Sequence, residues 1–304
     1  MRFTIFQDSK KGGRKVNQDR LAYSYSKNVL LLVIADGMGG HARGEIAAEI
    51  AVNTITSRFQ QDARSALRKP LEFLHHAFNA AHRAILAFAD EHDMLECPRT
   101  TCVGCIIQDG KAWWAHSGDS RLYVLRKGKL AISTRDHSRV QQLIDAGMIT
   151  KEAAATHPDR NKIYNCLGGV LPPEITPSEE WPLEVGDTIL LSTDGFWAPV
   201  PAHYIAAKLR TENILDLMPV LLEEAERTAG DESDNLSVVA VTWERQDDEE
   251  VPTQTVTSTV PMDGFRTETN MGQGDKEPIQ EPVSDEEIER AIAEIQNAIK
   301  KVSK

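Results

Sequence analysis

An unbroken apolar run that ends in an aspartate constrains this chain most. Residues 29–35 read Val-Leu-Leu-Leu-Val-Ile-Ala, and Asp36-Gly37 follows directly. A run of this length is typical of a strand that is buried on both faces. The pattern therefore predicts a core strand with a carboxylate at its end.

Apolar periodicity elsewhere alternates between that of strands and that of helices. The predicted strands are 3–8, 29–35, 101–107, 112–116, 122–125, 130–133, 187–192 and 236–243. The predicted helices are 44–59, 70–91, 202–209 and 213–229. Residues 136–170 are polar and are expected to form a surface insertion with short helices. Tight turns such as Asp109-Gly110 favour antiparallel pairing between the central strands.

Negative charge is concentrated at the C-terminal end of the chain. Of 46 acidic and 34 basic residues, 14 and 6 lie in residues 246–304, so this tail has a net charge of −8 and residues 1–245 have −4. The Asp, Glu, Thr, Pro and Gly content of residues 246–283 predicts a disordered linker. Residues 284–304 predict an amphipathic helix that docks on a partner protein. Its apolar stripe consists of Ile288, Ile292, Ile295, Ile299 and Val302.

Composition also excludes several classes of protein. The acidic balance counts against nucleic-acid binding. No stretch approaches the roughly 20 apolar residues that a membrane span needs, and no apolar leader is present, so we expect a cytoplasmic protein without membrane contact. Four cysteines are too few for a disulfide framework. Cys102 and Cys105 lie three apart on a predicted strand and would face opposite ways, which argues against zinc.

Aspartates follow or precede the predicted strands at five comparable points: Asp19, Asp36, Asp119, Asp194 and Asp234. Carboxylates gathered at one end of a sheet repel one another, and a hard divalent cation with oxygen ligands offsets that repulsion. Asp-Gly and Asp-Asn are also ordinary turn pairs, so none of them alone indicates a site. Together they predict a Mg²⁺ or Mn²⁺ centre.

The flanking residues of these aspartates form six ordered motifs. They are residues 14–19 (Arg-Lys-Val-Asn-Gln-Asp), 33–41 (Val-Ile-Ala-Asp-Gly-Met-Gly-Gly-His), 117–121 (Ser-Gly-Asp-Ser-Arg), 136–138 (Asp-His-Ser), 192–195 (Ser-Thr-Asp-Gly) and 233–235 (Ser-Asp-Asn). In this order the chain resembles the metal-dependent protein phosphatases of the PPM or type-2C family, in their bacterial branch. The resemblance runs from Phe3 to Trp243. It implies an α+β fold for residues 1–245, with four α-β-β-α layers made of two antiparallel sheets flanked by helices.

The resemblance also implies roles for individual residues. Asp36 would bridge two tightly held ions. Asp194 and Asp234 would complete one of them, and Asp19 with the Gly37 carbonyl would complete the other. Asp119 would hold a third, weaker ion. Arg14 would bind the substrate phosphate, and His41 is the candidate general acid for the leaving group.

The function that the resemblance implies is hydrolysis of phosphoserine and phosphothreonine in proteins by a metal-bridging hydroxide. The expected partners are phosphorylated proteins, a cognate bacterial serine/threonine kinase and a docking partner for residues 284–304, and the enzyme is expected to be a monomer. Two alternatives stay open: a catalytically weak phosphatase-like regulatory or binding module, and a hydrolase of small phosphoesters.

The sequence departs from the common family pattern in a few places. Pro98-Arg99 stand where the family usually has Met-Gly, and Gln18 stands where many members have Glu. His41 comes four residues after Gly37, whereas in the eukaryotic pattern histidine follows Asp-Gly directly, so a role in ordering the glycine-rich turn is an equal alternative. We interpret His137 as structural support for the insertion.

Overall fold

The computed structural model describes residues 1–38, 43–63 and 66–245, together with the backbone of two further short strands, 256–259 and 267–270. The chain divides into the units Met1–Gly272 and Gln273–Lys304, so the division falls beyond the boundary predicted at residue 245. The described residues all belong to the first unit.

This unit contains two antiparallel sheets. The strands are β1 (Arg2–Lys10), β2 (Asp19–Tyr25), β3 (Val29–Met38), β4 (Arg99–Thr100), β5 (Cys102–Gln108), β6 (Lys111–Ser117), β7 (Arg121–Arg126), β8 (Lys129–Ser133), β9 (Thr176–Pro177), β10 (Trp181–Pro182), β11 (Thr188–Ser192), β12 (Leu236–Arg245), β13 (Val256–Thr259) and β14 (Thr267–Asn270). One sheet has the order β14-β1-β12-β11-β7-β8 and the other β10-β6-β5-β3-β2-β13, with β4 added beside β3 and β9 beside β6.

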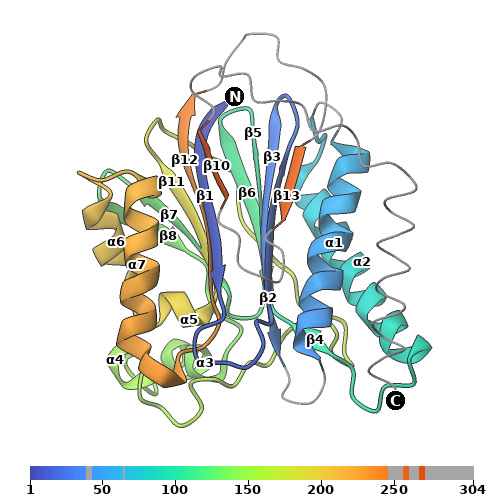
Figure 1. The fold of residues 1–304 in the computed structure, drawn as a ribbon. Coiled ribbons are helices and arrows are strands. Elements are labelled where there is room, and N and C mark those ends of the chain that lie inside the picture. Colours follow the sequence, from blue (N-terminus) through green and yellow to red (C-terminus); the bar gives the residue numbers. More distant parts are fainter. Residues whose placement is uncertain (39–42, 64–65, 246–255, 260–266, 271–304) are drawn as a thin grey trace. The chain divides into compact units, whose positions relative to one another are not determined.

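Helices cover the outer face of each sheet (Figure 1). They are α1 (Gly44–Asp62), α2 (Pro70–Glu91), α3 (Arg139–Asp145), α4 (Lys151–Ala154), α5 (Asp194–Trp197), α6 (Ala202–Lys208) and α7 (Ile214–Ala229), followed by a short 3₁₀ helix, Gly230–Glu232. The pair α1 and α2 lies over the β2–β3–β5–β6 sheet, and α6 and α7 lie over the other sheet. The predicted four-layer α-β-β-α fold is confirmed.

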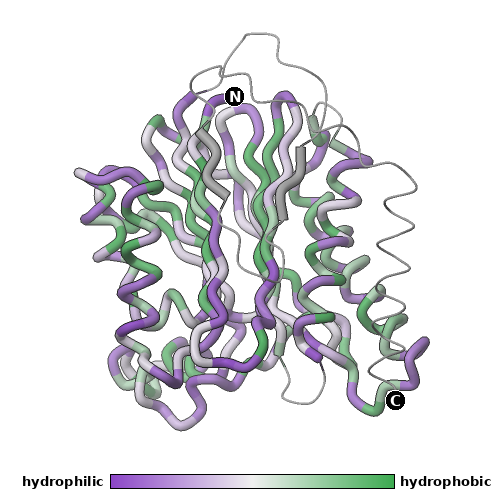
Figure 2. The backbone as a smooth tube through the Cα atoms, in the orientation of Figure 1, coloured by the Kyte–Doolittle hydropathy of each residue, from purple (hydrophilic) through white to green (hydrophobic). Residues whose placement is uncertain are grey.

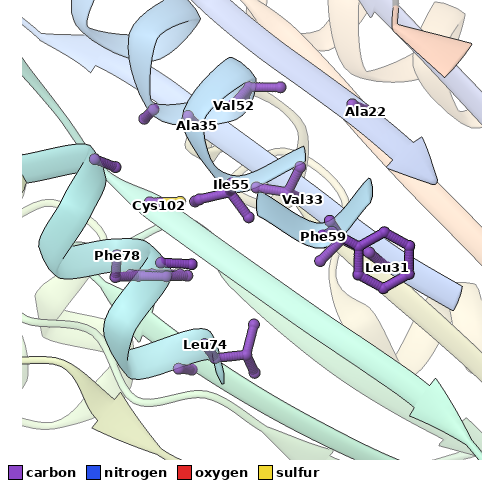
Figure 3. Packing of buried hydrophobic residues seen from close by; sticks show 14 of the residues in the cluster. Ala22, Leu31, Val33, Ala35, Val52, Ile55, Phe59, Leu74, Phe78 and Cys102 are labelled. Carbon is purple, nitrogen blue, oxygen red and sulfur yellow. The ribbon is translucent and has the colours of Figure 1, made fainter. Parts of the chain in front are cut away.

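Three apolar cores separate the four layers. Residues of β3 alternate between two of them: Leu31 and Val33 pack against α1 and α2, whereas Leu32 and Ile34 pack between the sheets. Figure 3 shows the first of these cores, with Phe59 of α1 and other helix side chains over the strands. Strand side chains alternate in direction with a period of two, so a core strand between two layers must be apolar at every position. This requirement explains the unbroken run at 29–35.

Most predicted elements are present, with small shifts at their ends. The strand β2 was not predicted, because its sequence Asp-Arg-Leu-Ala-Tyr-Ser-Tyr mixes polar and apolar residues without a clean alternation. The one-turn helix α5 and the two-residue strands β9 and β10 are too short for a periodic signal. Figure 2 shows that the strands are largely hydrophobic along their length and that hydrophilic segments gather where they end.

Two short strands are described within residues 246–283, for which the composition predicts disorder. The strand β13 pairs with β2 and β14 pairs with β1, so each adds to an outer strand of a sheet. The composition of a segment indicates how much apolar surface it can bury. Backbone hydrogen bonding to the edge of an existing sheet requires little apolar burial, so composition does not exclude it. The remaining residues of the predicted linker and the predicted helix at 284–304 lie outside the described residues.

Candidate metal centre

The rows of side chains between the two sheets change from apolar to acidic at one end. Leu21 and Ile34 belong to the core between the sheets. Asp19 lies two residues before Leu21 and Asp36 two residues after Ile34, so both carboxylates continue the same face. Asp19 and Asp36 are also register partners in the β2–β3 pair. The strand register therefore brings these two carboxylates together.

On the facing sheet, the side chains that point between the sheets also change from apolar to polar at this end. Leu191 and Val239 are part of the core between the sheets, and Thr193 and Ser237 lie one same-face step beyond them. The Thr193 hydroxyl donates to Asp19 Oδ2 at 2.9 Å and accepts from the Ser237 backbone N–H at 3.1 Å. Polar contacts thus join the two sheets where the apolar core ends.

Mutual repulsion and burial act on the carboxylates gathered there. Burial, with a smaller contribution from the charges of Asp194 and Asp234, raises the pKa of Asp19 to about 7, although hydrogen bonds from Ser237 and Thr193 act in the opposite direction. Burial and the neighbouring Asp234 raise the pKa of Asp194 to about 6. The pKa values of Asp36 and Asp119 are also raised, mainly by burial and then by the nearby acids. The negative charges of these aspartates affect one another's pKa values. We call the five residues the carboxylate cluster: Asp19, Asp36, Asp119, Asp194 and Asp234.

The carboxylate cluster suits a hard divalent cation. Asp19 Oδ1 and Asp119 Oδ1 are buried and have no hydrogen-bond partner in the described part of the chain. Unsatisfied buried anionic oxygens are costly, and Mg²⁺ or Mn²⁺ prefers oxygen ligands. Within the described ranges, however, no three acidic, histidine or cysteine side chains lie close enough together to hold one ion. Asp234 instead directs both carboxylate oxygens to Arg14.

Two glycines allow the backbone to approach closely beside the cluster. A Cβ on Gly37 would lie 2.3 Å from the Gly44 carbonyl, so the end of β3 can meet the start of α1 only if this residue is glycine. A Cβ on Gly195 would lie 2.2 Å from the Asn235 carbonyl. The latter contact explains why Asp194-Gly195 and Asp234-Asn235 reach the same place from distant parts of the sequence.

Arg14 lies at the rim of the cluster. Its Nε and Nη2 donate to the two oxygens of Asp234 at 2.9 and 2.7 Å. Asn235 holds the loop that carries Arg14: its side-chain amide donates to the carbonyls of Lys11 and Val16, and its Oδ1 accepts from the Gln18 N–H. The loop and the start of β12 are therefore one unit.

Asp119 is connected to the surface insertion. The Trp197 indole donates to the Asp119 carbonyl at 3.0 Å, and the Arg121 guanidinium stacks 3.5 Å from the Trp197 ring centroid. Arg121 also forms a two-point pair with Asp136, at 2.8 Å for each contact. The motifs that begin at Ser117 and at Asp136 thus meet beside the cluster.

His137 bonds several parts of the insertion. Its Nδ1 accepts from the Gly118 N–H at 3.1 Å and from the Asn165 amide at 2.6 Å, and its Nε2 lies 2.9 Å from Thr176 Oγ1. It stacks on His116 with 4.6 Å between the ring centroids. These contacts fit the predicted structural role.

Other predicted residues lie as follows. His41 is outside the described residues. Gln18 donates to Glu45 at 3.0 Å. Cys102 and Cys105 point into different cores, so they do not converge on a metal. A hollow of about 390 Å³ lies away from the cluster, between the ends of α1 and α2 that carry Arg58 and Lys69.

Comparisons with known proteins agree with this geometry. Residues 7–236 match the family model described as Protein phosphatase 2C. The serine/threonine protein phosphatase PstP of Mycobacterium tuberculosis is 34% identical over 232 residues, which are 76% of this chain and 43% of PstP. The serine/threonine phosphatase stp of Listeria monocytogenes is 30% identical over 216 residues, 70% of this chain and 84% of that protein. A solved structure of the PstP catalytic domain in complex with two manganese ions has a TM-score of 0.65 at 30% identity, covering 79% of this chain and 98% of that one.

The fold is thus that of the phosphatases it matches, and the chain belongs to the protein phosphatase 2C family. It spans less than half the length of the mycobacterial relative. Among the described helices, none is sufficiently long and apolar to cross a bilayer.

Sequence reasoning assigned no role to three residues that shape the site. Thr193, Ser237 and Asn235 bond the cluster or its loops. Two of them stand inside the motifs, but their partners are more than 40 residues away in sequence, and no local pattern reveals such contacts.

Proposed function

We propose that the chain hydrolyses phosphoserine and phosphothreonine monoesters in proteins with the help of Mg²⁺ or Mn²⁺. The observation that carries the proposal is the carboxylate cluster, in which Asp19 and Asp119 each have a buried oxygen without a hydrogen-bond partner in the described part of the chain. The serine/threonine specificity named for the bacterial relatives supports the substrate class.

The ligand assignment is the one that the resemblance to the family implies. Asp19, Asp36, Asp194, Asp234 and the Gly37 carbonyl are proposed to hold two ions, and Asp119 a third, weaker one. When bound, such ions supply an activated water and neutralise charge on the phosphate. The solved complex of the PstP catalytic domain with two manganese ions supports divalent metal use.

Arg14 is proposed to bind the substrate phosphate. Two of its nitrogens contact Asp234, which leaves further N–H donors of the planar fork for phosphate oxygens. Its half-exposed position at the rim lets a large substrate reach it. His41 as general acid, a cognate serine/threonine kinase as partner, a docking partner for residues 284–304, a monomeric state and a cytoplasmic location stay predictions from the sequence.

Phosphate release from phosphoserine, phosphothreonine and phosphotyrosine peptides tests the proposal, with the full chain, Mn²⁺ and an EDTA control. Asp36→Asn should lower kcat/KM about a hundredfold or more and weaken Mn²⁺ binding in calorimetry, because one cluster charge is lost. Asp90→Asn, on the exposed end of α2, is the matched control and should behave like the wild type.

Three outcomes would contradict parts of the proposal. Turnover in the presence of EDTA would show that the reaction does not require a divalent metal. Mn²⁺ binding without turnover of any substrate would indicate a binding module. Turnover of small aryl phosphates alone would indicate a small-phosphoester hydrolase.

A further inference from the structure

Arg99 lies beside the candidate metal centre, at a position where the sequence differs from the usual family pattern. The strand β4 pairs with the end of β3, so that Gly37 is opposite Thr100 and Met38 is opposite Arg99. This register continues that of the β3–β5 pair, in which Ile34 is opposite Val103. β4 and β5 therefore act as one strand alongside β3.

The continuous register fixes the face on which Arg99 lies. Val103 packs between the sheets, and Thr101 points the same way because its hydroxyl is 2.7 Å from Ser120 Oγ, in the turn that leads into β7 of the facing sheet. Arg99 is the next residue on that face. Asp36 and Met38 occupy the same face of the neighbouring strand. Arg99 is thus about 7 Å beyond the Asp36–Thr101 pair, on the side of the carboxylate cluster.

The surroundings of Arg99 leave its charge uncompensated. Its side chain is exposed and forms no ion pair or hydrogen bond within the described part of the chain. Arg14, Arg20 and Arg121 also lie near the cluster, and each is paired with an acidic side chain. On its other side, β4 is bridged through Thr100 to Leu167 of the insertion.

Arg99 lies close enough to two thiols to affect their pKa values. Its positive charge lowers the pKa of Cys97 and of Cys166, although burial raises both more strongly. Neither thiol supplies a negative charge at neutral pH. Arg99 is therefore a cation without an acidic partner in the described part of the chain, between the cluster and the insertion.

We propose that Arg99 is a specificity residue that binds the carboxylate of an acidic residue close to the phosphorylated serine or threonine. This inference rests on the proposed function. An extended peptide advances about 3.3 Å per residue, so the distance from the cluster to Arg99, with the length of its side chain, corresponds to about two to four residues. The guanidinium fork matches a carboxylate in two-point geometry.

The test uses the full chain with Mn²⁺ and a set of phosphothreonine peptides. Each peptide carries one Glu, or Gln at the same place, at one of the four positions on either side of the phosphothreonine. The wild type should prefer Glu to Gln about fivefold in kcat/KM at one or two positions, as expected for an exposed charge pair. The preference should shrink at 0.5 M NaCl because salt screens it.

Variants of Arg99 test whether this residue causes the preference for Glu over Gln peptides. Arg99→Glu should reverse the Glu-to-Gln ratio, Arg99→Gly should bring it to one, and Arg99→Lys should keep part of it. Arg83→Glu makes the same charge change on the exposed face of α2 and should keep the wild-type ratio. Because each ratio compares two substrates of one protein sample, partial loss of folding cancels.

The outcomes separate this inference from the proposed function. Hydrolysis of all peptides with a ratio of one, or a preference that survives Arg99→Glu, overturns the role of Arg99 alone. Failure to hydrolyse any phosphopeptide while an aryl phosphate is turned over overturns the proposed function as well.

Discussion

The hydrogen bonds of the His137 imidazole favour its neutral form. Its Nδ1 receives two N–H groups, from Gly118 and Asn165, so a proton on that nitrogen would meet two donors. Burial and the stacked His116 lower the pKa of His137 to about 4. In the unfolded chain a histidine has a pKa near 6.5. Between these values the unfolded state binds more protons, and the free energy of unfolding therefore falls as the pH drops from about 6.5 towards 4.

We predict that His137→Gln flattens this part of the pH dependence. Urea unfolding at pH 7 and pH 5 should show a smaller loss of stability in the variant than in the wild type, by about 1–2 kcal/mol. Comparison with the wild type cancels the opposite contribution of the carboxylate cluster. His75→Gln, on the exposed face of α2, is the control and should keep the wild-type slope. Equal slopes for His137→Gln and wild type would show that His137 titrates normally in the folded protein.

At the scale of elements, the site depends on where strands end and on what joins those ends. The loop that carries Arg14 is fixed to the start of β12 by three hydrogen bonds of Asn235. Both Asp19 and Asp234 lie within a residue of these contacts. Asn235 thus connects a phosphate-binding candidate to two candidate ligands.

Asn235→Ala should therefore weaken both stability and turnover. Loss of three partly buried hydrogen bonds should lower the free energy of unfolding by about 2–4 kcal/mol, and kcat/KM for an aryl phosphate should fall at least tenfold because the loop is no longer fixed. Urea denaturation and steady-state kinetics measure the two effects. Asn213→Ala removes the N-cap of α7, far from the cluster, and should cost about 1 kcal/mol with normal turnover. Normal kinetics in Asn235→Ala would show that the loop is held by other contacts.

The sequence predicts those elements whose signal is local. The apolar run of β3, the long amphipathic α2 and α7, and the aspartates at strand ends are all visible within a short window. β2 was missed although it carries Asp19, because its apolar face towards the other sheet is short and consists of Leu21, Tyr23 and the partly buried Tyr25. The hydrogen bond from Thr193 to Asp19 joins residues that are 174 positions apart, so no local sequence pattern predicts it.

At the scale of the whole molecule, one outer strand of each sheet is covered by a short additional strand. A strand with an unpaired side exposes backbone N–H and C=O groups to other chains. β1 and β2 would each be such an edge, and the short strands β14 and β13 pair with them. The strands β13 and β14 therefore belong to the two sheets, whereas the composition of residues 246–283 predicts a disordered linker.

Two truncations test this conclusion. Removal of residues 273–304 should leave the melting temperature and the oligomeric state unchanged. Removal of residues 246–304 also takes away β13 and β14, and should lower the melting temperature by about 3–10 °C and promote association through β1 and β2. Turnover of an aryl phosphate should stay within about twofold in both, because no residue of the carboxylate cluster lies beyond Asp234. Calorimetry, sedimentation and kinetics on the two proteins measure these effects. If both truncated chains melt alike and keep the same oligomeric state, the edge strands contribute nothing to the sandwich, and residues 246–272 act only as the linker that their composition predicts.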